Sequence, residues 1–199
     1  MTTPVAEFLG RLTRLDPAAL VRIRGAEIWA RVPWNVLVTR TVAGLSVDRT
    51  VSAAAWLAHD GDPATLPSLD DRWRAGLPPA TAPVVETIPS AVLRRLASSA
   101  AATLEETTQH GLNGRAVGSR ALRDALLDHV PIVVTTDDNE KEIRVPQRLV
   151  QAVARMGFLG ADEDPTQVRA VGVWVGISTG QGAAWWRAAT AMSLRPHRA

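Results

Sequence analysis

Residues 20–42 read LVRIRGAEIWARVPWNVLVTRTV, and this stretch decides the fold of the chain. Apolar and polar residues alternate in it with a period of two, which is the pattern of β-strands with one buried face. A two-residue turn at Gly25-Ala26 pairs Ile23 with Ile28 on the buried face. After the interruption at Pro33-Trp34, residues 36–42 are apolar on both faces. We therefore expect a third strand there that is covered on both sides.

The polar face of this stretch carries side chains that proteins commonly use for recognition. The same turn sets Arg22 opposite Trp29 and Arg24 opposite Glu27, and Arg31 follows on that face. An exposed arginine over an indole stabilises a hairpin by only about 0.5–1 kcal/mol. We therefore predict an open platform on which a partner binds. The alternative is that another layer of the same chain covers it.

Composition limits the class of protein. With 199 residues, 46% of them hydrophobic, the chain can build one domain or two small ones with a real core. The apolar runs are too short to span a bilayer, and the first residues do not have the pattern of a secretory signal. We expect a cytoplasmic protein without a membrane partner. The absence of cysteine excludes disulfides and thiol chemistry.

The calculated isoelectric point of about 10.2 does not indicate a strongly basic surface. The net charge is only +2, and Lys141 is the single lysine in a chain without tyrosine or cysteine. Because few groups titrate at high pH, a small surplus of arginine keeps the net charge positive far up the pH scale. Any basic patch must therefore be local.

The patterns along the chain predict an α+β fold. We expect an N-terminal helix with an antiparallel β-meander in residues 1–59, and a Pro- and Asp-rich loop or linker in residues 60–83. A helical half closed by a β-hairpin occupies residues 84–187, and residues 188–199 form a mobile tail. Trp73 favours an ordered surface segment over a free linker, because a disordered linker needs no buried tryptophan. No internal repeat is visible.

The helix that begins after Pro146 carries the strongest signal for nucleic-acid binding. Glutamine and arginine side chains, which read base edges and contact phosphates, form its polar face, and that face contains no acid. Two helices precede it and a hairpin follows, which is loosely the order of a winged helix-turn-helix, although a long connection separates the second and third helices. A plain solvated face is the alternative. The nucleic-acid hypothesis uses six side chains: Arg148, Gln151, Arg155, Arg22, Arg24 and Arg31.

A glycine-rich stretch before another helix suggests an anion site. Backbone N–H groups and the helix dipole favour an anion at such an N-terminus. The lysine of a Walker A loop is missing, so nucleotide hydrolysis is not supported. The residues that would hold a phosphate are Gly114, Arg115, Gly118, Ser119 and Arg120. A simple helix–helix connection is the alternative.

Tryptophans supply the candidate surface for protein contacts. Trp174 lies between two glycines, and a five-residue turn would place Trp186 opposite it. Two such indoles either clasp a partner or belong to the core. The predicted interaction residues are Trp29, Trp34, Trp174 and Trp186.

Signals for catalysis are weak. Residues 176–180 match the G-x-S-x-G nucleophile pattern at Ser178, but only His197 follows it, and the glycines indicate a hairpin turn instead of a helix. Asp124 and Asp128 share one helical face, with the imidazole of His129 beside them. These are too few ligands for a metal site, and Arg120 four residues before Asp124 is typical of a solvated ion-pair face. We expect no catalytic residue, no metal and no cofactor.

Three runs of sequence carry a resemblance: residues 32–40 (VPWNVLVTR), 120–130 (RALRDALLDHV) and 145–158 (VPQRLVQAVARMGF). They are similar to uncharacterised proteins of actinobacteria, and the arginine-rich, lysine-poor composition looks like that of a bacterium with a GC-rich genome. The resemblance covers most of the chain. It implies no activity and no catalytic residues.

Three hypotheses follow from the sequence. The first is a non-enzymatic protein that acts through its Trp- and Arg-bearing surfaces on a protein partner or in a homodimer. The second is a DNA- or RNA-binding regulatory protein with a winged-helix-like C-terminal half. The third is a phosphate- or metal-dependent enzyme assembled from scattered Asp and Arg residues.

Overall fold

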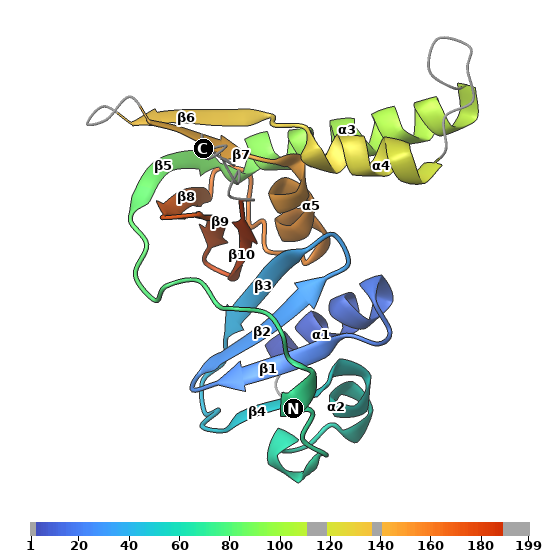
Figure 1. Cartoon of the computed structure of the whole chain (residues 1–199), viewed down its shortest axis with the longest axis vertical. Helices are drawn as coiled ribbons and strands as arrows, with labels where there is room; N and C mark the ends of the chain where they lie inside the picture. Colours follow the sequence, from blue (N-terminus) through green and yellow to red (C-terminus); the bar gives the residue numbers. More distant parts are fainter. Residues whose placement is uncertain (1–2, 111–118, 137–140, 189–199) are drawn as a thin grey trace, which may run out of the picture.

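The computed structural model describes residues 3–110, 119–136 and 141–188, and it confirms the α+β class (Figure 1). An eight-stranded antiparallel sheet has the order β4-β1-β2-β3-β10-β9-β8-β5, and a two-stranded sheet pairs β6 with β7. The strands are β1 (Leu20–Arg24), β2 (Glu27–Val32), β3 (Val36–Thr41), β4 (Asp48–Ser52), β5 (Val84–Pro89), β6 (Ile132–Thr136), β7 (Lys141–Val145), β8 (Pro165–Val171), β9 (Trp174–Thr179) and β10 (Gly182–Arg187). The helices are α1 (Thr3–Leu15), α2 (Ala53–His59), α3 (Ser90–His110), α4 (Ser119–Asp128) and α5 (Gln147–Arg155).

The first hairpin forms in the predicted register. β1 and β2 pair Ile23 with Ile28 and Arg22 with Trp29 across the Gly25-Ala26 turn. Gly25 has φ 59°, a left-handed conformation that glycine adopts without steric cost. β3 follows as predicted, and its first four residues are buried, as expected for a strand covered on both faces.

The large sheet consists of two similarly arranged halves that meet at β3 and β10. In each half a helix precedes a three-stranded meander, α1 before β1–β3 and α5 before β8–β10, and one further strand forms the outer edge, β4 or β5. β3 and β10 run antiparallel, with Val38 opposite Ala184. The sequence shows no repeat because the halves share an order of elements and not a run of similar residues. Their pairing joins segments far apart in the chain into one sheet.

Two predicted elements were wrong in their bounds. The mostly apolar run of residues 168–177 predicts the first strand of the closing hairpin. A turn at Gly172 (φ 58°) divides this run into β8 and β9. The β9–β10 turn is also tighter than predicted, with Thr179 opposite Gly182. Trp174 therefore lies opposite Arg187 and not opposite Trp186.

The segment after β3 also differs from its prediction. The local pattern of residues 51–58 predicts a helix with Asp48 as its cap. Asp48–Ser52 is instead strand β4, and Val51 pairs with Val21 of β1 in the core. The helix begins two residues later, at Ala53, where the Ser52 hydroxyl accepts a hydrogen bond from the Ala55 N–H at 3.3 Å. Pairing with β1 satisfies backbone groups of the β-branched run, which outweighs the local helical pattern.

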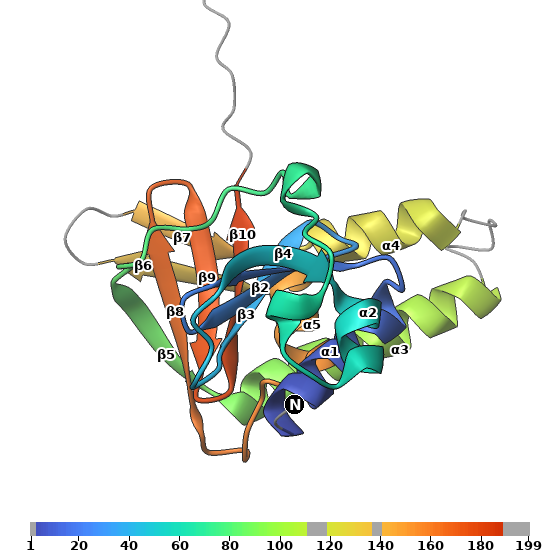
Figure 2. The same ribbon diagram turned by 90° about the horizontal axis from the view of Figure 1, so that it is seen from below.

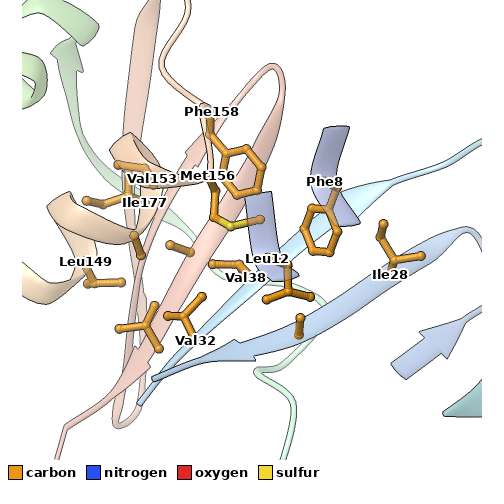
Figure 3. Close-up of a cluster of buried hydrophobic side chains, with 14 of the residues drawn as sticks. Phe8, Leu12, Ile28, Val32, Val38, Leu149, Val153, Met156, Phe158 and Ile177 are labelled. Carbon is orange, nitrogen blue, oxygen red and sulfur yellow. The ribbon is translucent and has the colours of Figure 1, made fainter. Parts of the chain in front are cut away.

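The main hydrophobic core lies between the sheet and helices α1 and α5 (Figure 3). Phe8 of α1 and Phe158, just after α5, stack with their ring centroids 6.3 Å apart. Ile28 and Ile177 reach the same core from opposite halves of the sheet, and all four side chains are almost completely buried. Burying each contributes about 1.5–3 kcal/mol. The core therefore spans the joint between the two halves.

Residues 60–83 are called the strap below, and their second part, from Trp73 to Ala82, lies against the opposite face of the sheet (Figure 2). Trp73 packs there, as the sequence indicates, together with Ala75 and Leu77. They cover a second buried cluster: Trp29, Leu37, Ala82, Ala183 and Trp185. The strap also follows the outer edge of β4, where the Leu69 N–H donates to the Thr50 carbonyl at 2.8 Å. The strap is thus an ordered layer of the fold.

The winged-helix expectation was wrong. Strands β8–β10 belong to the large sheet and pair with β3 and β5, so they do not form a separate wing beside α5. A two-stranded sheet, β6–β7, separates α4 from α5, where a helix-turn-helix has a short turn. α3 and α4 instead extend beyond the sheet (Figures 1 and 2). Among the described residues, every helix is too short or too polar to cross a membrane.

Candidate protein-binding groove

Helices α3, α4 and α5 enclose a groove of about 770 Å³, which the turn between β2 and β3 closes at one side. Its apolar walls are Ala100, Ala101 and Leu104 of α3, Leu126 and Leu127 of α4, and Leu15, Pro33 and Trp34 near the sheet. Leu126 and Leu127 both remain partly exposed. Ligand sites in proteins commonly have volumes of about 300–1,000 Å³ with apolar linings. The groove, defined by these residues, is therefore large enough for several side chains of a partner.

Trp34 is held in place by a reciprocal pair of hydrogen bonds with α5. Its indole Nε1–H donates to the Arg148 carbonyl at 3.0 Å, and the Arg148 guanidinium donates to the Trp34 carbonyl at 2.9 Å. Arg148 also forms an ion pair with Asp128 of α4, and its guanidinium lies 5.7 Å from the centre of the Trp186 ring. These contacts fix the position of α4 relative to α5 and to the sheet.

The polar face of α5 forms the floor of the groove. The Gln147 amide donates to the Leu96 carbonyl at 3.2 Å, and the Gln151 amide donates to the Ala97 carbonyl at 3.0 Å. Leu96 and Ala97 lie inside α3, where each carbonyl already accepts a backbone N–H of the helix. The glutamine amide is therefore a second donor to each carbonyl, which has two lone pairs. The glutamines are thus used to dock α3. The expected alternative of a plain solvated face also does not hold, because α3 and α4 cover most of it.

The rim of the groove is positively charged. Arg120 and Arg123 of α4 and Arg155 of α5 lie on it, against the single carboxylate of Asp124. In the part of the chain that the structure describes, none of these three guanidinium groups has a hydrogen bond or an ion pair. Three cations facing one acid favour a negatively charged partner.

The six residues of the nucleic-acid hypothesis lie in separate places. Arg148 and Gln151 make the internal contacts described above, and Arg155 is exposed on the rim of the groove. Arg22 binds Asp48 and Asp70 beside the strap. Arg24 lies at the end of β1, and Arg31 lies in a hollow near Trp174. The structure therefore does not gather these side chains into one surface.

Asp70 connects the strap to the edge of the sheet. Its carboxylate accepts hydrogen bonds from the Ser68 hydroxyl at 2.6 Å and the Thr50 N–H at 2.6 Å, and it lies 2.9 Å from Arg22. The hydrogen bonds of Ser68 and Thr50, with a smaller effect of the Arg22 charge, hold the pKa of Asp70 below its ordinary value. Arg22 is thus engaged within the chain.

The prediction that the first strands present Trp29 on an open platform was wrong. Trp29 is 6% exposed and lies beneath the strap in the second cluster. Trp174 packs at the border of the same cluster, and Trp186 packs against the main core. Of the four predicted interaction tryptophans, Trp34 is the one that lines the groove.

The predicted anion loop falls mostly outside the described residues. Gly114, Arg115 and Gly118 lie in the stretch 111–118, and Ser119 begins α4. Arg120 is the described member of this set, and it lines the groove.

The weak catalytic signals have structural explanations. Ser178 lies in β9 before a hairpin turn, and its hydroxyl accepts a hydrogen bond from Arg169 Nε at 2.9 Å. Asp128 of the acidic α4 face binds Arg148. No group of three or more His, Asp or Glu side chains within the described ranges is arranged to hold a metal ion.

Sequence reasoning missed the apolar walls of the groove. The sequence predicts a long helix with apolar Ala100 and Leu104, and a second helix with Leu126 on its inward side, but it does not indicate that these side chains line a groove. The available signal was the apolar stripe on each helix, because such a stripe packs against another element of the chain or against a partner.

Comparisons with known proteins give a family and a fold. The sequence pattern of the domain of unknown function DUF8185 matches residues 77–191, and that of the domain of unknown function DUF8010 matches residues 2–75. No curated protein matches. The chain belongs to the DUF8185 family, because that pattern covers more than half of it. The boundary between the matches lies in the strap, and β3 and β10 join the two matched regions.

The fold is similar to that of bacterial sliding clamps. A DNA polymerase III β subunit from Thermotoga maritima superposes with a TM-score of 0.53 at 11% identity over 92% of this chain and 62% of that one. The β subunit from Caulobacter crescentus gives 0.53 at 13% identity, with coverages of 92% and 64%. The clamp from Bacillus subtilis gives 0.53 at 10% identity, with 98% and 66%. The chain spans less than two thirds of each clamp, and identities this low establish a shared fold alone.

Proposed function

We propose that this member of the DUF8185 family is a protein-binding scaffold, and that the groove receives an acidic amphipathic segment of a partner protein. The observation that carries the proposal is the groove itself, with apolar walls and three arginines on the rim that have no partner among the described residues. An amphipathic helix laid into an apolar groove is a recurring mode of peptide recognition.

The apolar walls supply most of the binding free energy in this proposal. Each large side chain of the partner that leaves water against Trp34, Leu104 and Leu127 contributes about 1.5–3 kcal/mol. Each exposed arginine pairs with a carboxylate for only about 0.2–1 kcal/mol. The arginines therefore select acidic segments and speed their association, while the walls hold them.

The shared fold is compatible with this role. The clamps that superpose on the chain are subunits of DNA polymerase III, and a polymerase subunit works within a protein assembly. This likeness supports a contact role and does not identify the partner.

A peptide selection tests the proposal. Random 15-residue peptides displayed on phage are selected on the purified protein, and the enriched sequences are labelled and titrated by fluorescence anisotropy. We expect peptides with helically spaced large apolar residues and intervening Asp or Glu. The double variant Arg123→Ala/Arg155→Ala should weaken their binding about tenfold, and added salt should shrink that difference.

Arg95→Ala is the matched control for the peptide test. Arg95 is an exposed arginine of α3 that does not line the groove, so its loss should leave peptide binding unchanged. Enrichment of basic peptides, or equal affinity for the double variant and the wild type, would contradict the proposal. If the protein associates with itself in the absence of peptide, and the double variant Arg123→Ala/Arg155→Ala does not, the groove is the interface of a homodimer instead.

Nucleic-acid binding is the second candidate. The observation in its favour is the same set of rim arginines, since a phosphate backbone is also an anionic partner. In this case a labelled 30-bp duplex, and not an acidic peptide, should bind with an affinity that falls steeply with salt. Absence of duplex retardation at low salt would remove this candidate.

A further inference from the structure

A second cavity lies on the opposite face of the sheet, beneath the strap. It has a volume of about 1,040 Å³, its floor is the joint between β3 and β10, and strap residues 77–80 and Ala82 form one wall. We call it the seam cleft. Each of the two matched regions contributes to its lining. Trp29 belongs to the DUF8010 region, and Trp185 belongs to the DUF8185 region. The seam cleft therefore exists only where the two halves of the chain meet.

Arg169 of β8 places a positive charge in the wall of the seam cleft, and no carboxylate of the described residues pairs with it. Its partly buried guanidinium donates to three neutral acceptors, the Ser178 hydroxyl at 2.9 Å, the Ala82 carbonyl at 2.9 Å and the Gln167 amide oxygen at 2.7 Å. These bonds fix the guanidinium and tie the strap to the sheet. They do not neutralise its charge, and a partly buried cation is most stable beside an anion.

The other charged groups of the seam cleft increase this excess. Arg24, at the end of β1, is exposed and has no partner within the described ranges, and Arg40 binds the Pro4 carbonyl at 2.9 Å, with Glu7 4.0 Å away. Glu27 is the single carboxylate of the lining. Its Oε2 accepts a hydrogen bond from the Trp29 indole at 3.2 Å, whereas the three side-chain hydrogen bonds that Arg169 makes among the described residues go to other groups.

The floor of the seam cleft combines indole rings with an unpaired hydroxyl. Thr39 of β3 lies between Trp29 and Ala183 in the register of the sheet. Thr39 is 7% exposed, and its hydroxyl has no hydrogen-bond partner among the described residues. Burying a hydroxyl without a partner costs stability, so such a group is expected where a ligand supplies the missing bond.

We propose that the seam cleft binds a small organic oxyanion with a planar apolar body. The anionic group lies at Arg169, and the body lies against the indole-bearing floor at Trp29 and Trp185. A carboxylate and a phosphate monoester share this chemistry, and the test below distinguishes them. The site is independent of the groove, which lies among the helices at a different part of the molecule.

The test uses anilinonaphthalene sulfonate, a fluorescent aromatic anion, as the probe on the folded full-length chain. We expect one saturable site from which benzoate or phenyl phosphate displaces the probe, while neutral benzyl alcohol displaces it at least tenfold less well. The more effective of the two anions identifies the carboxylate or the phosphate class. Equal displacement by benzyl alcohol, or no binding of the probe, would overturn the proposal.

A pair of neighbouring strap variants locates the site without disturbing Arg169. Ala80 and Thr81 are both exposed, but Ala80 lines the seam cleft and Thr81 does not. Ala80→Asp adds a carboxylate at the cleft and should weaken probe binding at least fivefold, whereas Thr81→Asp should change it less than twofold. Equal effects of the two substitutions would show that the probe binds elsewhere. Circular dichroism confirms that both variants are folded.

Discussion

At the scale of single residues, most of the arginines that suggested recognition serve the fold. Arg22, Arg148 and Arg169 each bind several groups within the chain, and each fixes one segment to another. Sequence reasoning placed Arg22 on the correct face of the first hairpin, because alternation along a strand determines facing. It had no means to find Asp70 as its partner, since that contact depends on the path of the strap.

Asp70 gives the first test at this scale, which is the pH dependence of stability. Its folded pKa lies below its unfolded value, so the stabilisation is complete above the unfolded value of about 4 and is lost as the pH falls through the folded pKa. Asp70→Asn should therefore lower stability at pH 7 and flatten the acid limb of a plot of urea midpoint against pH. Parallel acid limbs for the variant and the wild type would show that Asp70 does not contribute this way.

At the scale of elements, α5 shows what periodicity determines and what it leaves open. The helical spacing of Leu149, Val150 and Val153 in the sequence predicts a buried side, and all three side chains are completely buried. The polar side was expected to face solvent or nucleic acid, but Gln147 is 2% exposed and binds α3. A stripe of polar residues indicates only that these side chains need hydrogen-bond partners. Backbone carbonyls of a neighbouring helix are such partners, as water is.

Substitutions on α5 test whether its polar side docks α3. Gln147→Ala removes a buried hydrogen bond and some packing, and it should lower the free energy of unfolding by about 1–2 kcal/mol. Arg155→Ala, on the exposed rim, should change it by less than about 0.5 kcal/mol. Urea denaturation measures both, and faster amide exchange in α3 should accompany the first. If both variants unfold like the wild type, the contact does not stabilise the docking of α3.

At the scale of the whole molecule, the sequence predicted the α+β class and the first hairpin but not the architecture. The β3–β10 pairing joins strands from the two ends of the chain, and no local pattern encodes such a partner. The strap was recognised as an ordered segment from Trp73, yet the face that it covers became visible only with the sheet assembled. Both cavities arise from these long-range contacts, the groove among the helices and the seam cleft at the joint of the halves.

The most direct test of the groove compares two adjacent alanines of α3. Both are exposed, but Ala101 lines the groove and Ala102 does not. With the selected acidic peptide in a fluorescence anisotropy titration, Ala101→Glu should weaken binding at least tenfold, because it adds volume and a like charge between the walls. Ala102→Glu should bind as the wild type does. Equal affinities of the peptide for both variants would contradict the assignment of the groove as the protein-binding site.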